Sequence, residues 1–216
     1  KITLPADSSL RKSVTIKNPL GDDTSVMRTT ALPSALEIAA YNQSVRNDSG
    51  RMYETGAVYI PALDGDGSVV KSELPEEKRK LIMINWGDGR DFYTLKGEVE
   101  AIITALSGRE AVFSPKTDDP SFHPGRTAEV YCGDITLGIL GEISPAVSAN
   151  YELAKRVYVA DIDVAALVSL GVKSPRYRQI SRYPSLLRDI AVTCAEEVTV
   201  GELTSTIKQS AGRLLK

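Results

Sequence analysis

The sequence predicts a domain that mixes helices and strands, and three observations support this prediction. Short apolar runs with β-branched or aromatic residues recur along the chain, separated by glycine, proline and asparagine, which is typical of strands and turns. The segment 95–106 instead repeats its apolar residues at helical spacing. The 216 residues are 42% hydrophobic and 25% charged, which is the composition of a globular protein with a substantial core.

The elements of the first half begin and end at residues with known preferences. Pro33 suits the first turn of a helix, which the polar run 46–50 is expected to end. Asp91 or Thr94 is expected to cap the helix at 95–106, and Gly108 is expected to close it. In chain order we expect a strand at 13–17, a helix from 33 to just before 46, a strand at 52–60, an exposed loop at 61–78, and a strand at 81–84 that is buried on both faces.

Short strands dominate the next part of the chain. Gly133-Asp134 is expected to form the turn of a hairpin. Gly138 and Gly141 lack both the lysine of a phosphate-binding loop and the spacing of a dinucleotide fold, so we interpret them as points of close backbone approach. Asp163 is expected to cap a short helix. The expected elements are strands at 111–114, 128–132, 136–140 and 156–162, and a helix at 164–170.

A change of composition near residue 173 indicates the end of this domain. Residues 173–184 are polar, contain arginine and proline, and show little periodicity, which predicts a linker. After it, 187–194 is typical of a strand, and Thr199 with Glu202 predicts the capping box of a helix. One strand and one helix are too little to bury a core. We therefore expect a main domain at 1–172, a linker at 173–184 and a truncated second domain at 185–216.

The residue totals exclude several classes of function. The formal net charge is −2, from 26 basic and 28 acidic residues, so the chain as a whole lacks the positive charge of a nucleic-acid-binding protein. His123 is the single histidine, which excludes a zinc site built on paired histidines. Cys132 and Cys194 each lie in an apolar run and are expected to be free thiols in a reducing compartment. No stretch reaches the ~20 apolar residues of a membrane span, and we expect a cytoplasmic protein.

Two local patterns are closer to a functional signal. Residues 64–68 resemble the start of a calcium loop, but Val69 and Pro75 occupy the positions where such loops carry glycine and glutamate, so we interpret them as an acidic surface loop. Arginine and tyrosine alternate over 176–188, a mix that suits phosphate contacts and base stacking, although a solvated linker is the alternative. The candidate RNA contacts are Arg176, Tyr177, Arg178, Arg182 and Arg188.

Several segments, taken in order, are similar to the beta subunit of bacterial-type phenylalanyl-tRNA synthetase. No single segment is specific, but their shared order is. They are Asn18-Pro19-Leu20, residues 27–33 (Met-Arg-Thr-Thr-Ala-Leu-Pro), Asn42, residues 53–56 (Tyr-Glu-Thr-Gly), residues 91–100, residues 123–126 (His-Pro-Gly-Arg), residues 137–145 and residues 160–163 (Ala-Asp-Ile-Asp). The stretch 183–191 resembles the opening of the C-terminal ferredoxin-like domain of that subunit.

The resemblance implies an α+β fold in which an antiparallel sheet is flanked by helices, as in class II aminoacyl-tRNA synthetases. A truncated ferredoxin-like unit that contacts the tRNA anticodon stem would follow. It also implies a phenylalanine–tRNA ligase of two alpha and two beta subunits, which uses ATP and Mg²⁺ and whose chemistry belongs to the alpha subunit. The present chain is then a non-catalytic core without a cofactor of its own, and its partners are the alpha subunit and tRNA(Phe).

The residues at the positions of a class II active site fit a lost catalytic function. The resemblance places Arg28 near the first of the arginines that hold ATP in such enzymes. The expected strand and helix over 157–170 contain no arginine and offer Asp161 and Asp163, whose charges disfavour a triphosphate. We therefore predict that this domain binds no ATP and contains no catalytic residue. The candidate interface or fold-defining residues are Arg28, His123, Arg126 and Glu142.

Three functions remain open. The first is a scaffold that packs against the alpha subunit, which predicts a large apolar surface patch. The second is a stand-alone RNA-binding module without a ligase partner, which predicts an RNA affinity that falls with salt. The third is a small-molecule site in what remains of the class II pocket, for which the fold alone is no support.

Overall fold

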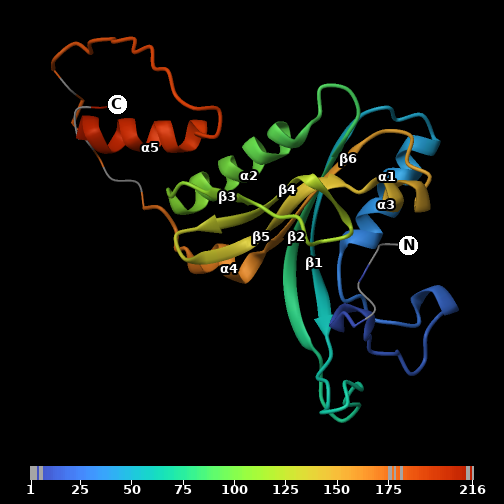
Figure 1. The fold of residues 1–216 in the computed structure, drawn as a ribbon. Helices are drawn as coiled ribbons and strands as arrows, with labels where there is room; N and C mark the ends of the chain where they lie inside the picture. The colour runs from blue at the N-terminus through green and yellow to red at the C-terminus, as the bar shows by residue number, and fades with distance from the viewer. Residues whose placement is uncertain are drawn as a thin grey trace. The chain divides into compact units, whose positions relative to one another are not determined.

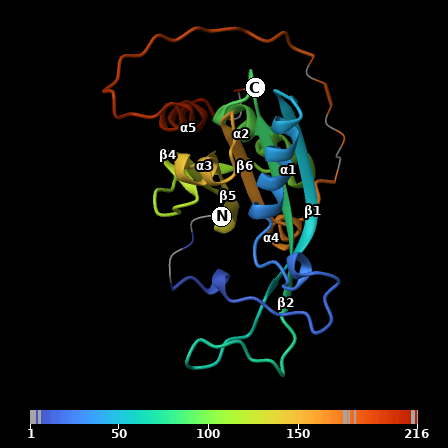
Figure 2. The ribbon, with the colours of Figure 1, turned by 90° about the vertical axis from the view of Figure 1, so that its right-hand side faces the viewer.

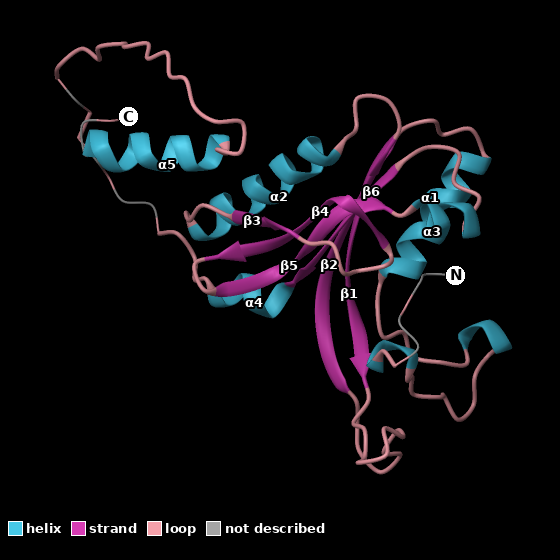
Figure 3. Ribbon diagram, in the orientation of Figure 1, coloured by secondary structure: helices cyan, strands magenta, loops and turns pink. Residues whose placement is uncertain are grey.

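The chain divides into two compact units, residues 1–174 and residues 175–216. The structure is a computed structural model that describes residues 4, 7–174, 177, 179–180, 182–212 and 215. The first unit is built on one six-stranded sheet with the order β1-β2-β6-β5-β4-β3, in which all neighbouring strands are antiparallel (Figure 3). Its strands are β1 (Gly50–Ile60), β2 (Glu76–Trp86), β3 (Val112–Pro115), β4 (Phe122–Cys132), β5 (Ile135–Ile143) and β6 (Val157–Asp163).

Helices cover both faces of this sheet, and each face has its own apolar core. Helices α1 (Leu32–Ser44) and α3 (Pro145–Asn150) lie on one face, and α2 (Phe92–Ser107) and α4 (Val164–Ser169) lie on the other (Figure 1). Figure 2 views the sheet from the α1 side. Strand β2 contributes to both cores, because Ile82 and Ile84 pack toward α1 while Met83 packs toward α2. The expected α+β class, with an antiparallel sheet and flanking helices, is confirmed.

The helix ends follow the capping residues that the sequence offers. Asp91, rather than Thr94, caps α2, because its Oδ1 accepts a hydrogen bond from the Thr94 N–H at 2.7 Å. The hydrogen bonds that the Thr94 backbone N–H and the Thr94 hydroxyl donate to Asp91 lower the pKa of its carboxyl, and the backbone hydrogen bond has the larger effect. Gly108 ends α2 in the left-handed conformation at φ 70°. Asp163 caps α4 in the same way as Asp91, accepting from the Ala166 N–H at 3.0 Å.

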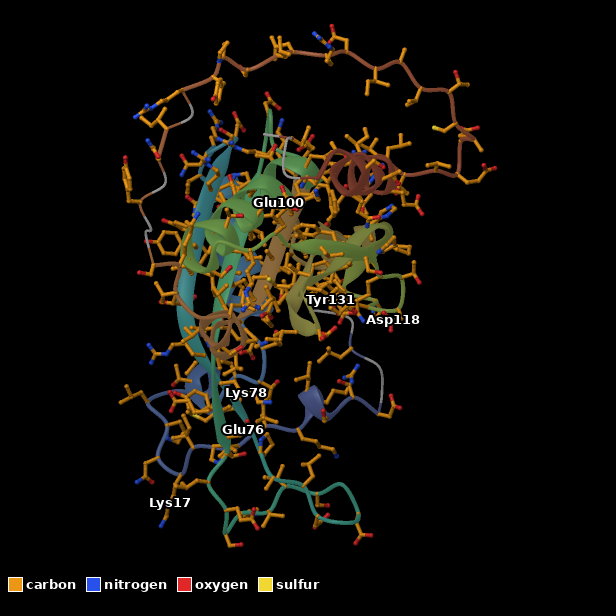
Figure 4. The ribbon with its side chains drawn as sticks, turned by 90° about the vertical axis from the view of Figure 1, so that its left-hand side faces the viewer. Lys17, Glu76, Lys78, Glu100, Asp118 and Tyr131 are labelled. Atoms are coloured by element: carbon orange, nitrogen blue, oxygen red, sulfur yellow. The ribbon has the colours of Figure 1, made fainter. Side chains whose placement is uncertain are left out.

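The longest pairing, between β1 and β2, corrects the expected loop at 61–78. Strand β2 begins at Glu76, so residues 76–78 belong to the strand and pair with residues 58–60 of β1. Glu76 and Lys78 lie on this outer part of β2, where the hairpin extends beyond the rest of the sheet (Figure 4). Charged residues are compatible with a strand there because most of them stay exposed. The apolar run 81–84 therefore indicated only the inner part of the strand, which is buried from Ile82 to Trp86.

Two glycines of β5 allow neighbouring strands to approach, as expected. A Cβ atom on Gly138 would collide with the backbone carbonyl of Asp161 on β6. A Cβ atom on Gly141 would lie 2.6 Å from Oγ1 of Thr127 on β4. Glycine is therefore required at both positions for the observed packing of β5 between its neighbours.

Two strand predictions are wrong. The segment 13–17 forms only an isolated bridge between Thr15 and Val26 rather than a strand, since it pairs with no strand of the sheet. In the second unit, the described residues hold the helix α5 (Val200–Ala211) but no strand at 187–194. An extended segment without a paired neighbour leaves its N–H and C=O groups to water.

The capping box of α5 is confirmed, because the Glu202 N–H donates to Thr199 Oγ1 and the Thr199 N–H donates to Glu202 Oε2. Across the described residues, no helix combines the length and apolar character that crossing a membrane requires.

Candidate functional site

An irregularity in β4 creates the most unusual group of charges in the first unit. Phe122 pairs with Ile143 of β5, but Thr127 pairs with Gly141, so the four residues 123–126 face a single residue, Glu142. The bulge is held by hydrogen bonds of its own: His123 Nδ1 accepts from the Gly125 N–H at 3.1 Å, and the His123 carbonyl accepts from Thr127 Oγ1 at 2.6 Å. The bulge brings Arg126 beside Glu142.

Glu142 is an almost fully buried carboxylate shared by two arginines. Its side chain is 6% exposed, and Arg126 Nη1 donates to Oε1 at 3.1 Å and to Oε2 at 2.8 Å. Arg156, which directly precedes β6, places its Nε 3.7 Å from Oε1. We call Arg126, Glu142 and Arg156 the Glu142 cluster. A buried carboxylate is tolerated only when such partners replace its lost hydration, so the cluster holds three segments of chain together.

Tyr158 of β6 completes the surroundings of this carboxylate. It is paired in register with Glu142 and is buried. Burial, followed by the charge of Glu142, raises the pKa of Tyr158. Tyr158 therefore remains a neutral phenol at physiological pH and adds an aromatic ring beside the Glu142 cluster.

Two hollows adjoin the Glu142 cluster, and Arg126 and Arg156 line both of them. The first has a volume of about 580 Å³ and is bounded by the start of α2, by β3, by β4 and by the start of β6. We call it the aromatic hollow, since its lining includes Phe92, Tyr93, Phe113 and Tyr158. The second has a volume of about 540 Å³ and is lined by polar and charged side chains that include His123, Glu142 and Lys155, together with part of α3.

Arg28 is engaged in structural contacts on the other face of the sheet. Its Nη2 lies 2.5 Å from Glu54 Oε1, and its Nε donates to the Ala57 carbonyl at 2.9 Å. Gly56 lies between these residues, and a Cβ atom there would collide with the guanidinium of Arg28. Arg28 thus fixes the segment before α1 to β1.

Asp161 and Asp163 share one lysine. Lys80 Nζ lies 3.5 Å from Asp161 Oδ1 and 3.6 Å from Asp163 Oδ2. Burial raises the pKa of Asp161, and the ion pair with Lys80 opposes this shift. Across the part of the chain that the structure describes, no three His, Cys, Asp or Glu side chains gather in a way that could hold a metal ion.

The candidate RNA contacts belong to the second unit. Arg176 and Arg178 lie outside the described residues. Tyr177, Arg182 and Arg188 are exposed, and Arg188 Nη1 donates to the Leu187 carbonyl at 3.0 Å. Arg182 and Tyr183 line a shallow hollow together with Gln179 and Ile180.

Helix α1 and its C-cap residue Val45 expose an apolar stripe that sequence reasoning did not single out. Ile38, Tyr41 and Val45 follow each other at helical spacing and are 38%, 68% and 50% exposed. We call these three residues the α1 stripe. Strand β1, an edge strand of the sheet, also exposes Tyr53, but its register partner Met83 packs toward α2, so Tyr53 lies on the face of the sheet opposite α1. A stripe of exposed apolar side chains such as that of α1 is typical of a protein–protein interface.

The amino-acid sequence matches a family model described as the phenylalanyl tRNA synthetase beta chain CLM domain, over residues 1–164. The chain belongs to this family. It is 39% identical to the phenylalanine–tRNA ligase beta subunit of Clostridium acetobutylicum and 36% identical to that of Clostridium tetani, each over 216 residues. These alignments cover 100% of this chain but 26% of each relative, so the chain spans about a quarter of the length of the relatives it matches.

Among solved structures, the fold is similar to that of pyrrolysyl-tRNA synthetase from Desulfitobacterium hafniense, a class II synthetase, with a TM-score of 0.59. The sequence identity is 15%, and the match covers 78% of this chain and 56% of that one. At this identity the likeness concerns the fold alone, and it agrees with the expected synthetase-like architecture.

Proposed function

We propose that this chain is the non-catalytic core of the beta subunit of a phenylalanine–tRNA ligase. In this role it binds the catalytic alpha subunit and helps to position tRNA(Phe) for ATP-dependent aminoacylation in the cytoplasm. The observation that carries the proposal is the family match over residues 1–164, together with the exposed α1 stripe. We expect an assembly of two alpha and two beta subunits, in which ATP and Mg²⁺ bind the alpha subunit.

The contacts within the first unit support a structural rather than a catalytic role. Arg28 is ion-paired with Glu54 and hydrogen-bonded to the Ala57 carbonyl. The negative charges of Asp161 and Asp163 disfavour the binding of a triphosphate unless a metal intervenes. For the second unit we propose the opening of a ferredoxin-like domain at residues 185–216, joined by the linker at 173–184.

The decisive experiment is assembly with the alpha subunit of the same organism. The chain and the alpha subunit are co-expressed, the complex is sized by light scattering, and aminoacylation of tRNA(Phe) is assayed. We expect a stable complex and no aminoacylation by the chain alone. The double variant Ile38→Asp, Tyr41→Asp should weaken the complex about tenfold or more, because charges would have to be buried in an apolar contact.

Leu106→Asp, at an exposed apolar position of α2, is the matched control and should leave assembly unchanged. Equal weakening by both variants would show that the α1 stripe is not the contact surface. Failure of the unmodified chain to bind the alpha subunit would overturn the scaffold proposal itself.

A stand-alone RNA-binding module is the second candidate, favoured by the exposed Arg182 and Tyr183 that line one hollow. It predicts a tRNA affinity that falls steeply with salt and that decreases in an Arg182→Gln, Arg188→Gln variant. Tight tRNA binding without any alpha-subunit complex would favour this candidate over the scaffold.

A further inference from the structure

The aromatic hollow has the size and the walls of a small-molecule site. Its volume of about 580 Å³ lies within the range of roughly 300–1,000 Å³ that is usual for ligand pockets. Rings and prolines form much of its wall, and the two arginines that share Glu142 form its charged end. The lining residues that the argument uses are Tyr93, Phe113, Arg126, Arg156 and Tyr158.

The aromatic side chains of the hollow are held by contacts of their own. Tyr93 packs edge to face against Phe92, with ring centroids 5.5 Å apart and an interplanar angle of 89°. Lys96 Nζ lies over the Phe113 ring, 4.7 Å from its centroid. Tyr158 is buried beneath the hollow. Tyr93 is itself 75% exposed, so the face of its ring is accessible for stacking against a flat ring of a ligand.

The charged end of the hollow carries an excess of positive charge. Arg126 and Arg156 share one carboxylate, that of Glu142. Arg126 donates to it through Nη1, and Nε of Arg156 lies 3.7 Å from it. The two arginine side chains remain 43% and 67% exposed. Arg156 also hydrogen-bonds the Tyr158 side chain, and the remaining N–H groups of the two exposed guanidinium groups are accessible to an anion. Asp91 also lines the hollow, but its charge is opposed by the N-terminus of α2, which it caps.

The two guanidinium groups and Glu142 together leave one positive charge, which Asp91 reduces only in part because the N-terminus of α2 offsets its charge. A single carboxylate matches it, and an arginine fork binds a carboxylate with parallel hydrogen bonds. A triphosphate carries several more negative charges than the arginine end offers.

We propose that the aromatic hollow binds a small aromatic carboxylate, with its ring against Tyr93 and Phe113 and its carboxylate on Arg126 and Arg156. This site does not depend on the ligase function proposed above. It assigns to Arg156, Tyr93 and Phe113 a binding role that is separate from assembly and from RNA contact.

Phenylacetate is a suitable probe, because two relatives of it separate the contributions of ring and charge. Phenylacetamide keeps the ring without the charge, and acetate keeps the charge without the ring. Each is titrated into the ¹⁵N-labelled chain, and amide shifts are followed by NMR. We expect phenylacetate to bind with a Kd on the order of 1 mM and to shift the amides of residues 91–93, 113, 125–128 and 156–158. Phenylacetamide and acetate should each bind about tenfold more weakly.

Arg156→Gln is the test variant, since its long contact with Glu142 makes it the more dispensable of the two arginines for folding. It should weaken phenylacetate binding about tenfold. Lys155→Gln is the matched control: it removes the same charge one residue earlier, at a side chain that lines only the second hollow, and should change the Kd less than about twofold. Tyr93→Ala should weaken binding of phenylacetate but not of acetate.

Three results would overturn the proposal. The first is the absence of shifts at phenylacetate concentrations well above the expected Kd. The second is equal weakening by Lys155→Gln and Arg156→Gln, which would indicate only diffuse attraction to a basic surface. The third is a dinucleotide such as ApA displacing phenylacetate at a lower concentration, which would assign the hollow to a nucleic acid strand instead.

Discussion

Replacing Arg126 by glutamine tests whether the Glu142 cluster stabilises the fold. The change removes two hydrogen bonds, at 3.1 and 2.8 Å, from a carboxylate that is 6% exposed. Breaking a buried ion pair costs about 3–5 kcal/mol. Because Arg126 is partly exposed and Arg156 stays 3.7 Å from the carboxylate, we expect a smaller loss, of about 2–3 kcal/mol.

Trp86 provides the assay, since it is the single tryptophan of the chain and is 1% exposed in the first unit. Urea unfolding followed by its fluorescence reports the stability of that unit. With an m-value of roughly 2 kcal/mol/M, Arg126→Gln should lower the urea midpoint by about 1 M. The double variant Arg126→Gln, Glu142→Gln should lose less than the sum of the two single variants, because it leaves no buried charge without a partner.

Arg51→Gln is the matched control. Arg51 Nη1 also binds a carboxylate, Glu98, at 3.1 Å, but that side chain is 20% exposed and the arginine itself is mostly in solvent. We expect a loss below about 1 kcal/mol. If Arg126→Gln costs no more than Arg51→Gln, the buried carboxylate does not depend on Arg126, and the role assigned to the bulge in β4 is wrong.

Two further changes test a cap and a buried acid. Asp91→Ala should destabilise the first unit by about 1 kcal/mol, because it leaves the N–H groups of α2 without their cap; an unchanged urea midpoint would contradict this. Asp161 has a raised folded-state pKa caused by burial, so the native state binds its proton more tightly and this residue lowers stability as the pH rises through that pKa. Asp161→Asn should therefore reduce the fall in stability between acidic and neutral pH, whereas an identical pH profile for both proteins would show that the buried carboxylate is not the cause.

Short-range signals in the sequence predicted much of the fold. Asp91, Asp163 and Thr199 each cap the helix that was expected to follow them, because a cap depends on residues only two or three positions away. The glycines of β5 were interpreted as close approaches for a similar reason: glycine weakens the interior of a strand, so its presence there indicates that a neighbouring backbone needs the space. These signals are local and therefore visible without a structure.

Features that depend on distant parts of the chain could not be predicted in the same way. Glu142 and Arg126 were named through family resemblance, but Arg156 and Tyr158 join them only through the register of β5 against β6. The outer part of β2 was taken for a loop because its charged side chains face solvent and show no apolar period. Likewise, the segment 187–194 has the composition of a strand but no neighbouring strand to pair with among the described residues.

The bulge in β4 also means that the number of residues between two strand pairs can differ from the number on the neighbouring strand without changing how β4 and β5 align. Phe122 and Thr127 keep their own partners on β5, while the four residues 123–126 lie between them with only Glu142 opposite the whole segment. Pro124 lines the aromatic hollow but belongs to neither apolar core, so we expect an insertion there to leave the strand pairs on both sides in place. The bulge is therefore a natural position for grafting a tag or a fluorophore close to both hollows without realigning a single strand.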